Sequence, residues 1–159
     1  MAKRSAGLLP FRRASTGEIE VFIVHPGGPF WANKDAGAWS VAKGEYEPGE
    51  DPRTVAYREF LEELGVEAPS GRILDLGEVK QSGGKRVQVW AIEAPDFVVE
   101  AIDSNEFELE WPPRSGRMQR FPEVDVGAWF DFDEAKHRIQ SGQLPILEEL
   151  AQLLEERRS

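Results

Sequence analysis

The segment from residue 44 to residue 66 constrains this chain more than any other part of the sequence. It reads GEYEPGEDPRTVAYREFLEELGV. Asp51 followed by Pro52 is typical of the start of a helix, where the aspartate caps the first turn and proline loses no hydrogen bond. Gly65 is typical of a helix end. The sequence therefore predicts a helix that runs from Pro52 to Leu64.

Three glutamates crowd one face of this predicted helix, because Glu62 and Glu63 fall within about 60° of Glu59. Like charges at such spacing destabilise a helix by roughly 0.2–0.5 kcal/mol. Hard cations with oxygen ligands, such as Mg²⁺, remove that penalty. A solvated acidic surface is the alternative for any glutamate-rich helix. The other side of the helix carries the side chains expected to anchor it to a core: Ala56, Tyr57, Phe60, Leu61 and Leu64.

The complete spacing of the segment resembles the Nudix box of the MutT-related pyrophosphohydrolases. Its fixed positions are filled by Gly44, Glu50, Arg58, Glu59, Glu62, Glu63 and Gly65, and its apolar positions by Phe60 and Val66. At a background usage of roughly 6–7% per residue type, seven identities coincide by chance on the order of once in 10⁸ windows. The resemblance favours the metal-binding alternative, and it implies a Nudix-type α/β/α sandwich with a mixed β-sheet flanked by helices.

The resemblance also implies a role for each residue of the box. Glu59, Glu62 and Glu63 are expected to bind Mg²⁺, with Mn²⁺ as a substitute, and Gly44 to offer its backbone carbonyl as a further ligand. Arg58 is expected to reach back to Glu59 or Glu50 and fix its orientation. Glu59, Glu62 and Arg58 are therefore predicted catalytic residues.

A second segment, residues 121–130, resembles the part of the family that brings an additional glutamate to the metal cluster. It reads FPEVDVGAWF, and Glu123 is the residue expected to act there as ligand or catalytic group. Asp125 competes with it for that role. So does an alternating acidic series that also fits an exposed strand edge: Glu106, Glu108 and Glu110.

Several residues outside the box are candidates for binding substrate. Lys43 precedes the box glycine and could contact phosphate, or could simply be solvated. Trp31 and Trp111 fall in predicted loops and are candidates to stack on a base. Three arginines could clamp a polyphosphate by charge-assisted hydrogen bonds, or could balance nearby acids: Arg114, Arg117 and Arg120. Three other tryptophans lie in apolar segments and are predicted to belong to the core: Trp39, Trp90 and Trp129.

The remaining pattern predicts one domain over residues 1–159, with two hairpins and further helices near the end of the chain. Strands are expected at 5–13, 18–25, 39–41, 72–81 and 86–94, with a loop at 26–38 and a short apolar segment at 126–130. Residues 95–122 are expected to be irregular around a loop at 111–117. Helices are expected at 133–139, capped by Asp133, and at 144–157.

Composition excludes several classes of protein. The net charge of −10 argues against a protein that grips a nucleic-acid polymer. The absence of cysteine excludes disulfides and thiolate metal sites. No apolar run has the length of a signal sequence or a membrane span, so we expect a cytoplasmic protein without a membrane contact. The sequence leaves the oligomeric state open, a homodimer included.

These patterns together predict an enzyme in which water attacks phosphorus in a pyrophosphate linkage. The expected partner is a small nucleotide, and a dinucleoside polyphosphate is favoured because two long loops suit an extended substrate. Oxidised or ordinary nucleoside triphosphates, and ADP-ribose or nucleotide sugars, are the alternatives. A catalytically inactive nucleotide-binding domain is disfavoured, because such a domain should have lost carboxylates of the box.

Overall fold

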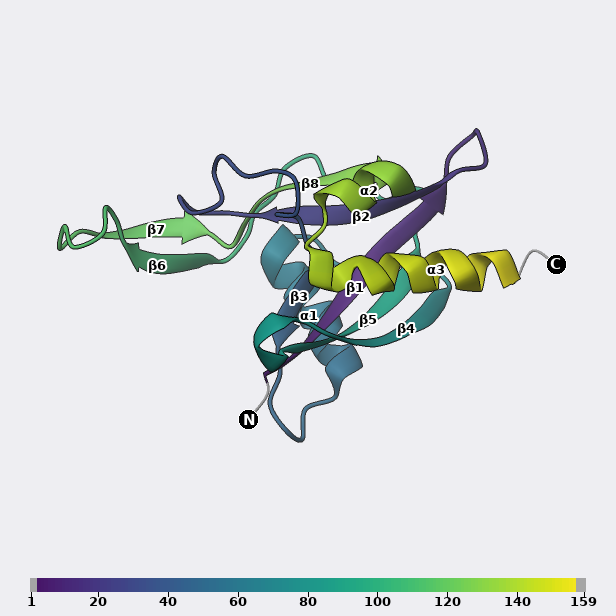
Figure 1. Cartoon of the computed structure of the whole chain (residues 1–159), viewed down its shortest axis with the longest axis horizontal. Helices are drawn as coiled ribbons and strands as arrows, with labels where there is room; N and C mark the ends of the chain where they lie inside the picture. The colour runs from purple at the N-terminus through teal and green to yellow at the C-terminus, as the bar shows by residue number, and fades with distance from the viewer. Residues whose placement is uncertain (1–2, 157–159) are drawn as a thin grey trace.

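The first strand lies at the centre of a mixed six-stranded sheet in the computed structural model, which describes residues 3–156 (Figure 1). The strands are β1 (Arg4–Arg13), β2 (Ile19–Pro26), β3 (Ala42–Glu45), β4 (Ile73–Lys80), β5 (Arg86–Glu93), β6 (Glu106–Glu110), β7 (Met118–Pro122) and β8 (Val124–Asp131). The helices are α1 (Pro52–Leu64), α2 (Phe132–Arg138) and α3 (Leu144–Glu156), with short 3₁₀ turns η1 (Ser82–Gly84) and η2 (Ser141–Gln143).

The sheet forks at β1. Along one edge β1 pairs with β5 in parallel, over Arg4 to Phe11. The other edge is shared by two antiparallel partners, because β3 pairs with residues 5–8 and β2 with residues 11–13. β8 extends the sheet beyond β2, and β4 extends it beyond β5. Since β2 and β3 diverge from a common edge, the fork between them leaves room for a site.

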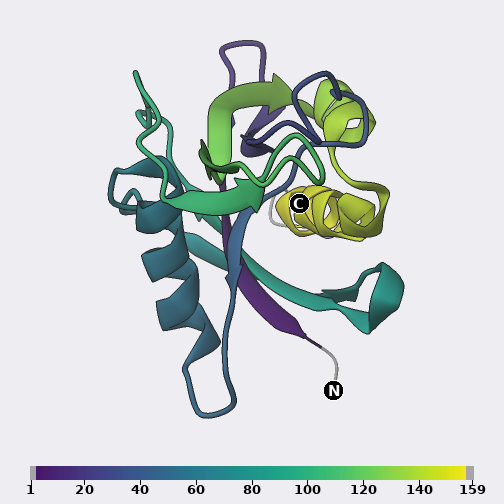
Figure 2. The ribbon, with the colours of Figure 1, turned by 90° about the vertical axis from the view of Figure 1, so that its left-hand side faces the viewer.

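Helices cover both faces of the sheet (Figures 1 and 2). β1 alternates between two cores: Ala6 and Leu8 belong to the cluster beneath α1, while Leu9 and Phe11 belong to the cluster beneath α2 and α3. This double burial explains why β1 reads as a nearly continuous apolar run. Full burial of a side chain such as Phe11 contributes about 1.5–3 kcal/mol. The predicted α/β architecture, a mixed sheet flanked by helices, is confirmed.

Most regular elements lie where the sequence predicts them. The two hairpins and α1 match their expected bounds to within one or two residues. α3 buries a stripe at helical spacing, namely Ile146, Leu147, Leu150 and Leu154. Its predicted last residue, Arg157, lies outside the described residues. Leu61, which was expected to help anchor α1, is 44% exposed instead, because the buried face of the helix turns toward Val55 and Phe60.

Three local predictions are wrong. The strand expected at 39–41 begins at Ala42, and Trp39 and Ser40 form only isolated bridges. α2 is capped by Asp131 and not by Asp133, because the side chain of Asp131 accepts the backbone N–H of Glu134 at 2.8 Å.

The segment 95–122 is not wholly irregular, which is the third correction. β6 and β7 pair antiparallel and form a separate two-stranded hairpin around the loop 111–117. We call residues 106–122 the arm, because this hairpin projects away from the main sheet (Figure 1). The glutamates of β6 alternate with half-buried residues, which confirms the exposed strand edge as their interpretation.

The loop 26–38 lies along the arm. The backbone N–H of Gly27 donates to the carbonyl of Glu123 at 2.9 Å. Gly28 has a φ of 97° and packs so closely that an added Cβ would lie 2.9 Å from the ring of Phe107. The first turn of this long loop therefore follows the root of the arm. No helix within residues 3–156 is long and apolar enough to cross a membrane.

Candidate active site

Helix α1 presents the box glutamates because both of its ends are fixed. The carboxylate of Asp51 accepts the backbone N–H of Thr54 at 3.2 Å and its hydroxyl at 2.7 Å. Gly65 ends the helix in the left-handed conformation, with a φ of 76°, and its N–H donates to Leu61. Phe60 is fully buried under the helix. The rotation of α1 about its axis is thereby set, and with it the direction of the glutamates.

Glu63 is a charged residue on the buried side of the helix. Only 6% of its surface is exposed, and its Oε1 accepts the backbone N–H of Lys43 at 3.2 Å. Burial raises the pKa of Glu63 to about 8, because the N–H of Lys43 offsets only part of the lost solvation. A carboxylate so placed is costly unless a cation compensates for its charge.

Glu59 lies against the box glycine. A Cβ added at Gly44 would overlap the carboxyl group of Glu59, so a larger residue at this position would displace that side chain from where it lies. Burial, followed by the neighbouring carboxylate of Glu62, raises the pKa of Glu59 to about 7. These two groups therefore compete for the same protons and the same cations.

Arg58 reaches back along the helix, as its position in the box predicts. Its guanidinium donates to Glu50 at 3.1 Å and lies 4.0 Å from Glu59. Glu50 also accepts the backbone N–H of Glu47 at 2.9 Å, and that bond and Arg58 hold the pKa of Glu50 below its usual range. Arg58 thus connects the loop before α1 to the carboxylate face.

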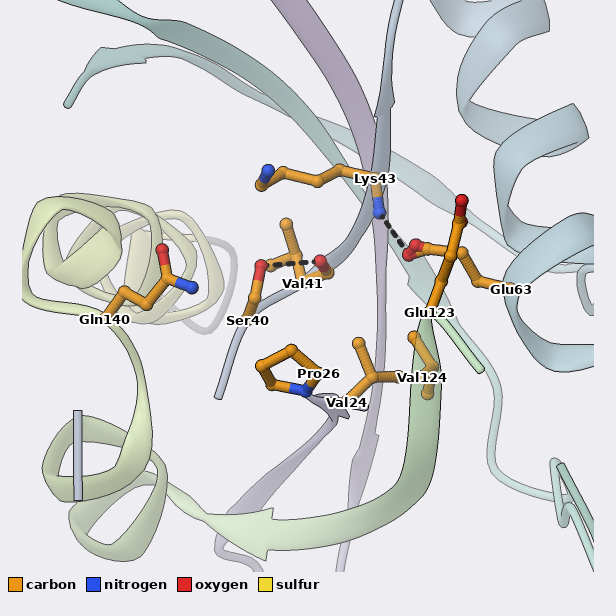
Figure 3. A pocket seen from close by; sticks show the side chains of 9 residues that line it. All are labelled: Val24, Pro26, Ser40, Val41, Lys43, Glu63, Glu123, Val124 and Gln140. Atoms are coloured by element: carbon orange, nitrogen blue, oxygen red, sulfur yellow. Dashed lines mark hydrogen bonds between the residues drawn. The ribbon is translucent and has the colours of Figure 1, made fainter. Parts of the chain in front are cut away.

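Glu123 joins this cluster from the junction of β7 and β8. Its backbone N–H donates to the carbonyl of Asn105 at 2.8 Å, and the N–H of Asn105 donates to the carbonyl of Glu62 at 2.9 Å. Burial, and then the charge of Glu62, raises the pKa of Glu123. Glu123 and Glu63 line the same pocket (Figure 3). The structure therefore brings the predicted extra glutamate to the box.

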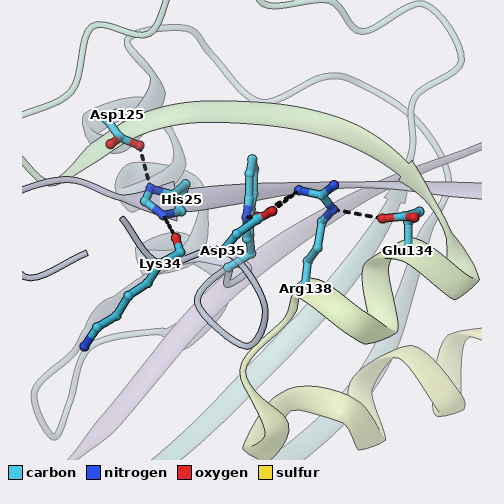
Figure 4. A network of polar contacts seen from close by, with 7 residues as sticks. His25, Lys34, Asp35, Asp125, Glu134 and Arg138 are labelled. Carbon is cyan, nitrogen blue, oxygen red and sulfur yellow. Dashed lines mark hydrogen bonds and ion pairs between the residues drawn. The ribbon is translucent and has the colours of Figure 1, made fainter. Parts of the chain in front are cut away.

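The competing acids lie elsewhere. Asp125 is turned toward His25, whose Nδ1 lies 2.8 Å from its carboxylate, while the other ring nitrogen lies 2.6 Å from the carbonyl of Lys34 (Figure 4). This contact fixes the loop 26–38 to β8, which gives His25 a structural role. Glu106, Glu108 and Glu110 lie exposed on the arm.

A pocket of about 150 Å³ opens in the fork between β2 and β3 (Figure 3). Lys43 extends from β3 across this pocket, away from Glu63 and toward Ser40 and Gln140. Burial lowers the pKa of Lys43, although the charge of Glu63 opposes that shift. The pocket therefore combines one ammonium group with two carboxylates, Glu63 and Glu123.

The remaining substrate candidates do not reach this pocket. Arg114 and Arg117 lie at the exposed end of the arm, and Arg120 pairs with Glu108 at 3.5 Å. Trp111 lies in the same loop, half-buried. Trp31 packs against the core beneath α2 and α3, with the ammonium of Lys34 over its ring at 5.3 Å. Of the three tryptophans predicted to be core residues, Trp39 and Trp90 are buried and Trp129 is partly buried.

The donor set suits a hard divalent cation. It combines carboxylate oxygens with a backbone carbonyl at Gly44, and these are the ligands that Mg²⁺ prefers. The close approach of Gly44 to the carboxyl group of Glu59 places the backbone of Gly44 beside that carboxylate. As these side chains stand, no three acidic or histidine residues within residues 3–156 are close enough to hold one ion together. The residues suit a divalent cation in their chemistry, and they lie in one region of the structure.

Sequence reasoning missed two positioning residues. Asn105 joins the backbones of Glu62 and Glu123. Gln143 is fully buried, accepts the N–H of Val41 at 3.0 Å and donates to Ser40 at 2.9 Å, so it fixes the segment that leads into β3. Both contacts join residues far apart in the sequence, and no local pattern marks them.

The raised pKa values predict how the stability of the metal-free protein depends on pH. Glu59 and Glu63 titrate near 4.5 when exposed but at about 7 and about 8 in the fold. Their contribution is fully present below pH 4.5 and is lost as the pH rises through the folded values. The free energy of unfolding should therefore decrease between about pH 5 and about pH 8. Urea denaturation in the presence of a chelator measures this change.

Glu63→Gln should show a shallower decrease over the same pH range, while the exposed Glu106→Gln should behave like the unaltered protein. The prediction is contradicted if the free energy of unfolding rises between these pH values, and rises more in the unaltered protein than in Glu63→Gln.

This fold and this glutamate-bearing helix define the class of the protein. The family model described as NUDIX domain matches residues 1–150. The chain therefore belongs to the Nudix family, and the resemblance seen in residues 44–66 is confirmed.

Two curated relatives share sequence with the chain, and one solved structure shares its fold. The chain is 32% identical over 116 residues to mouse bis(5′-nucleosyl)-tetraphosphatase [asymmetrical], covering 67% of this chain and 75% of the relative. It is 32% identical over 102 residues to human diphosphoinositol polyphosphate phosphohydrolase 3-alpha, covering 64% and 57%. A Caenorhabditis elegans Ap4A hydrolase in a binary complex matches its fold with a TM-score of 0.66, at 18% identity, covering 98% of this chain and 99% of the other. The predicted enzyme class, a Nudix pyrophosphohydrolase acting on phosphorus-containing anhydrides, is confirmed.

Proposed function

We propose that this protein is a Mg²⁺-dependent hydrolase that cleaves a phosphoanhydride bond in a dinucleoside polyphosphate. The observation that carries the proposal is the meeting of α1 and the β7–β8 junction. There Glu63 and Glu123 line one pocket with Lys43, and both carboxyl groups have raised pKa values. Carboxyl groups with raised pKa values in a cleft, together with the spacing of the Nudix box on α1, indicate a catalytic role more than a structural one.

The residues that would hold the metal are Glu59, Glu62, Glu63 and Glu123, with the carbonyl of Gly44. A divalent cation bound there would neutralise phosphate oxygens and lower the pKa of bound water. Arg58 keeps Glu59 and the preceding loop in place through its contacts at 4.0 Å and 3.1 Å. The chain itself thus supplies orientation and negative charge.

The reaction requires one proton acceptor and one group that binds phosphate. The oxygen of water forms a bond to phosphorus, and the bond from that phosphorus to the bridging oxygen breaks. One carboxylate of the cluster accepts the proton of the water, while the departing fragment carries the bridging oxygen. Lys43, whose ammonium extends across the pocket, provides a positive charge for a phosphate group of the substrate.

The preference for a dinucleoside polyphosphate is supported by the relatives and by the arm. The mouse relative is named for its action on a bis(5′-nucleosyl) tetraphosphate. The arm carries Arg114 and Arg117 in a chain with a net charge of −10, where an extended polyphosphate needs positive charge beyond the carboxylate cluster. The human relative, named for action on diphosphoinositol polyphosphates, makes that class a second candidate.

A substrate panel tests the proposal. With Mg²⁺ present, kcat/KM for diadenosine tetraphosphate should exceed that for ADP-ribose and for 8-oxo-dGTP by at least about tenfold, because only the long substrate reaches both the pocket and the arm. One product should be a nucleoside triphosphate. Chromatographic separation of products over time measures both quantities.

A tenfold preference for ADP-ribose, 8-oxo-dGTP or a diphosphoinositol polyphosphate would overturn the proposed substrate. No turnover of any member of the panel would instead favour a nucleotide-binding domain without catalysis.

A further inference from the structure

Near the tip of the arm lies an aromatic pair, one ring exposed and one half-buried, that the proposed chemistry does not use. Phe30, from the loop 26–38, and Trp111, from the arm, have ring centroids 5.4 Å apart and an interplanar angle of 74°. Phe30 is 57% exposed, whereas its neighbour Trp31 packs inward against the core. An edge-to-face pair leaves ring faces open, and such faces stack on nucleobases.

Two arginines, Arg114 and Arg117, lie in the same loop as Trp111, and the backbone carbonyl of Arg117 accepts the N–H of Trp111. Within residues 3–156, the side chains of Arg114 and Arg117 have no hydrogen bond or ion pair, although the chain holds 29 acidic residues and 19 basic ones. Unpaired arginines in such a chain remain available to an anionic ligand. An aromatic pair and free arginine side chains in one loop region match the two parts of a nucleotide, its base and its phosphates.

The loop that holds these groups has a defined conformation. The N–H of Trp111 donates to the carbonyl of Arg117 at 2.9 Å, and the amide of Gln119 donates to the carbonyl of Trp111 at 2.6 Å. Arg114 has a φ of 62°, the one positive value among the described residues other than glycine, and its N–H donates to Glu110 at 2.7 Å. Strained backbone of this kind clusters at ligand clamps.

The arm is rooted in the catalytic cluster. Asn105, just before β6, hydrogen-bonds through its backbone to Glu62 and to Glu123. From this root the five residues of β6 span about 17 Å to the tip. In Figure 2 the arm points toward the viewer between α1 and the pair α2 and α3. A ligand that touches both root and tip must be elongated.

We propose that Phe30 and Trp111 form the stacking site for the distal base of a dinucleoside polyphosphate, with Arg114 and Arg117 beside it for the adjoining phosphates. The inference rests on the proposed function, because it assigns the far end of a substrate whose scissile bond lies at the carboxylates. On this proposal, the arm selects substrates that carry a second nucleoside.

Two substrates with the same number of phosphates test the stacking site. Diadenosine tetraphosphate carries the distal base, and adenosine 5′-tetraphosphate lacks it. Phe30→Ala and Trp111→Ala should each raise KM for the dinucleotide by at least about fivefold. This is the lower end of the loss of affinity expected when one stacked base loses its aromatic partner. KM for adenosine tetraphosphate should change by less than about twofold, since that ligand makes no contact there.

Two kinds of control accompany these variants. Phe30→Tyr retains an aromatic face and should restore the KM of the unaltered protein. Val98→Ala shortens another exposed apolar side chain, 71% exposed and outside the arm, and should change neither KM. Calorimetric titration of both ligands without turnover, in a Glu63→Gln background, reports the same ratio of affinities independently of catalysis.

The possible outcomes separate the inference from the proposed function. Equal losses for both substrates, or no loss for either, would overturn the stacking site while hydrolysis still supports the function. If the unaltered protein hydrolyses neither ligand, the proposed function fails. The titration then decides the stacking site alone: a Phe30→Ala loss of affinity confined to the dinucleotide supports it, and an unchanged affinity overturns it.

Discussion

Replacing Glu63 by glutamine is expected to lower turnover by at least about 10²-fold while the fold remains intact. Glu63 is buried and accepts the N–H of Lys43 through a carboxylate oxygen, a bond that the carbonyl of glutamine can also accept. The variant therefore keeps the geometry but loses one negative charge from the proposed metal ligands. Glu62→Gln should cause a loss of the same order. Steady-state kinetics at saturating Mg²⁺ measures both.

The matched control for this prediction is Glu106→Gln, which makes the same chemical change on the exposed face of the arm. Its activity should remain within about twofold of the unaltered protein, as is usual for a surface substitution. Circular dichroism and a cooperative denaturation curve establish that Glu63→Gln is folded. Near-normal turnover in the folded variant would remove Glu63 from the catalytic cluster.

The second large effect is expected at Glu123, the acid that comes from outside the box. Glu123→Gln should reduce kcat/KM by a factor of at least about 10, because the carboxylate shares a pocket with Glu63 and interacts with the charge of Glu62. Its backbone bonds to Asn105 and Gly27 do not involve the side chain, so they persist in the variant. Initial rates measured over a range of Mg²⁺ concentrations and pH separate the two roles that Glu123 could have.

A metal ligand at position 123 predicts that the variant needs more Mg²⁺ for half-maximal rate. A proton acceptor predicts an unchanged Mg²⁺ requirement and loss of the acidic limb of the pH–rate profile. Glu108→Gln serves as the exposed control. If Glu108→Gln or Glu106→Gln proves more damaging than Glu123→Gln, then the assignment of Glu123 is wrong.

The helix could be predicted because its determinants are local. Asp51, Pro52 and Gly65 each act on backbone groups within one turn, so their meaning does not depend on the rest of the fold. The position of Arg58 beside Glu59 follows from the same helix, whereas its contact with Glu50 also depends on the loop before α1. Local pattern therefore predicts the parts of the site that lie on α1, whereas Glu123 was expected only from the resemblance to the family.

The parts that escaped prediction depend on contacts between distant segments. The hairpin of the arm was not expected, although the alternation of Glu106, Glu108 and Glu110 with Phe107 and Leu109 fitted an exposed strand edge. The partner strand of β6 lies beyond a seven-residue loop.

The loop 26–38 gave the same difficulty. Phe30 and Trp31 are adjacent aromatics, and the sequence does not say which one faces the core. The structure turns Trp31 inward and leaves Phe30 exposed beside Trp111. The choice follows from how the loop packs along the arm, which only the assembled fold determines.

The central claim is that this carboxylate cluster hydrolyses a phosphoanhydride bond with the help of a divalent cation. The direct test incubates the unaltered protein with diadenosine tetraphosphate in ¹⁸O-labelled water and separates the products by chromatography and mass. We predict one nucleoside triphosphate and one nucleoside monophosphate, with a single ¹⁸O in one of them, formed with Mg²⁺ and abolished by a chelator. Undiminished cleavage after removal of divalent cations, or no cleavage of the anhydride with Mg²⁺ present, would contradict the claim.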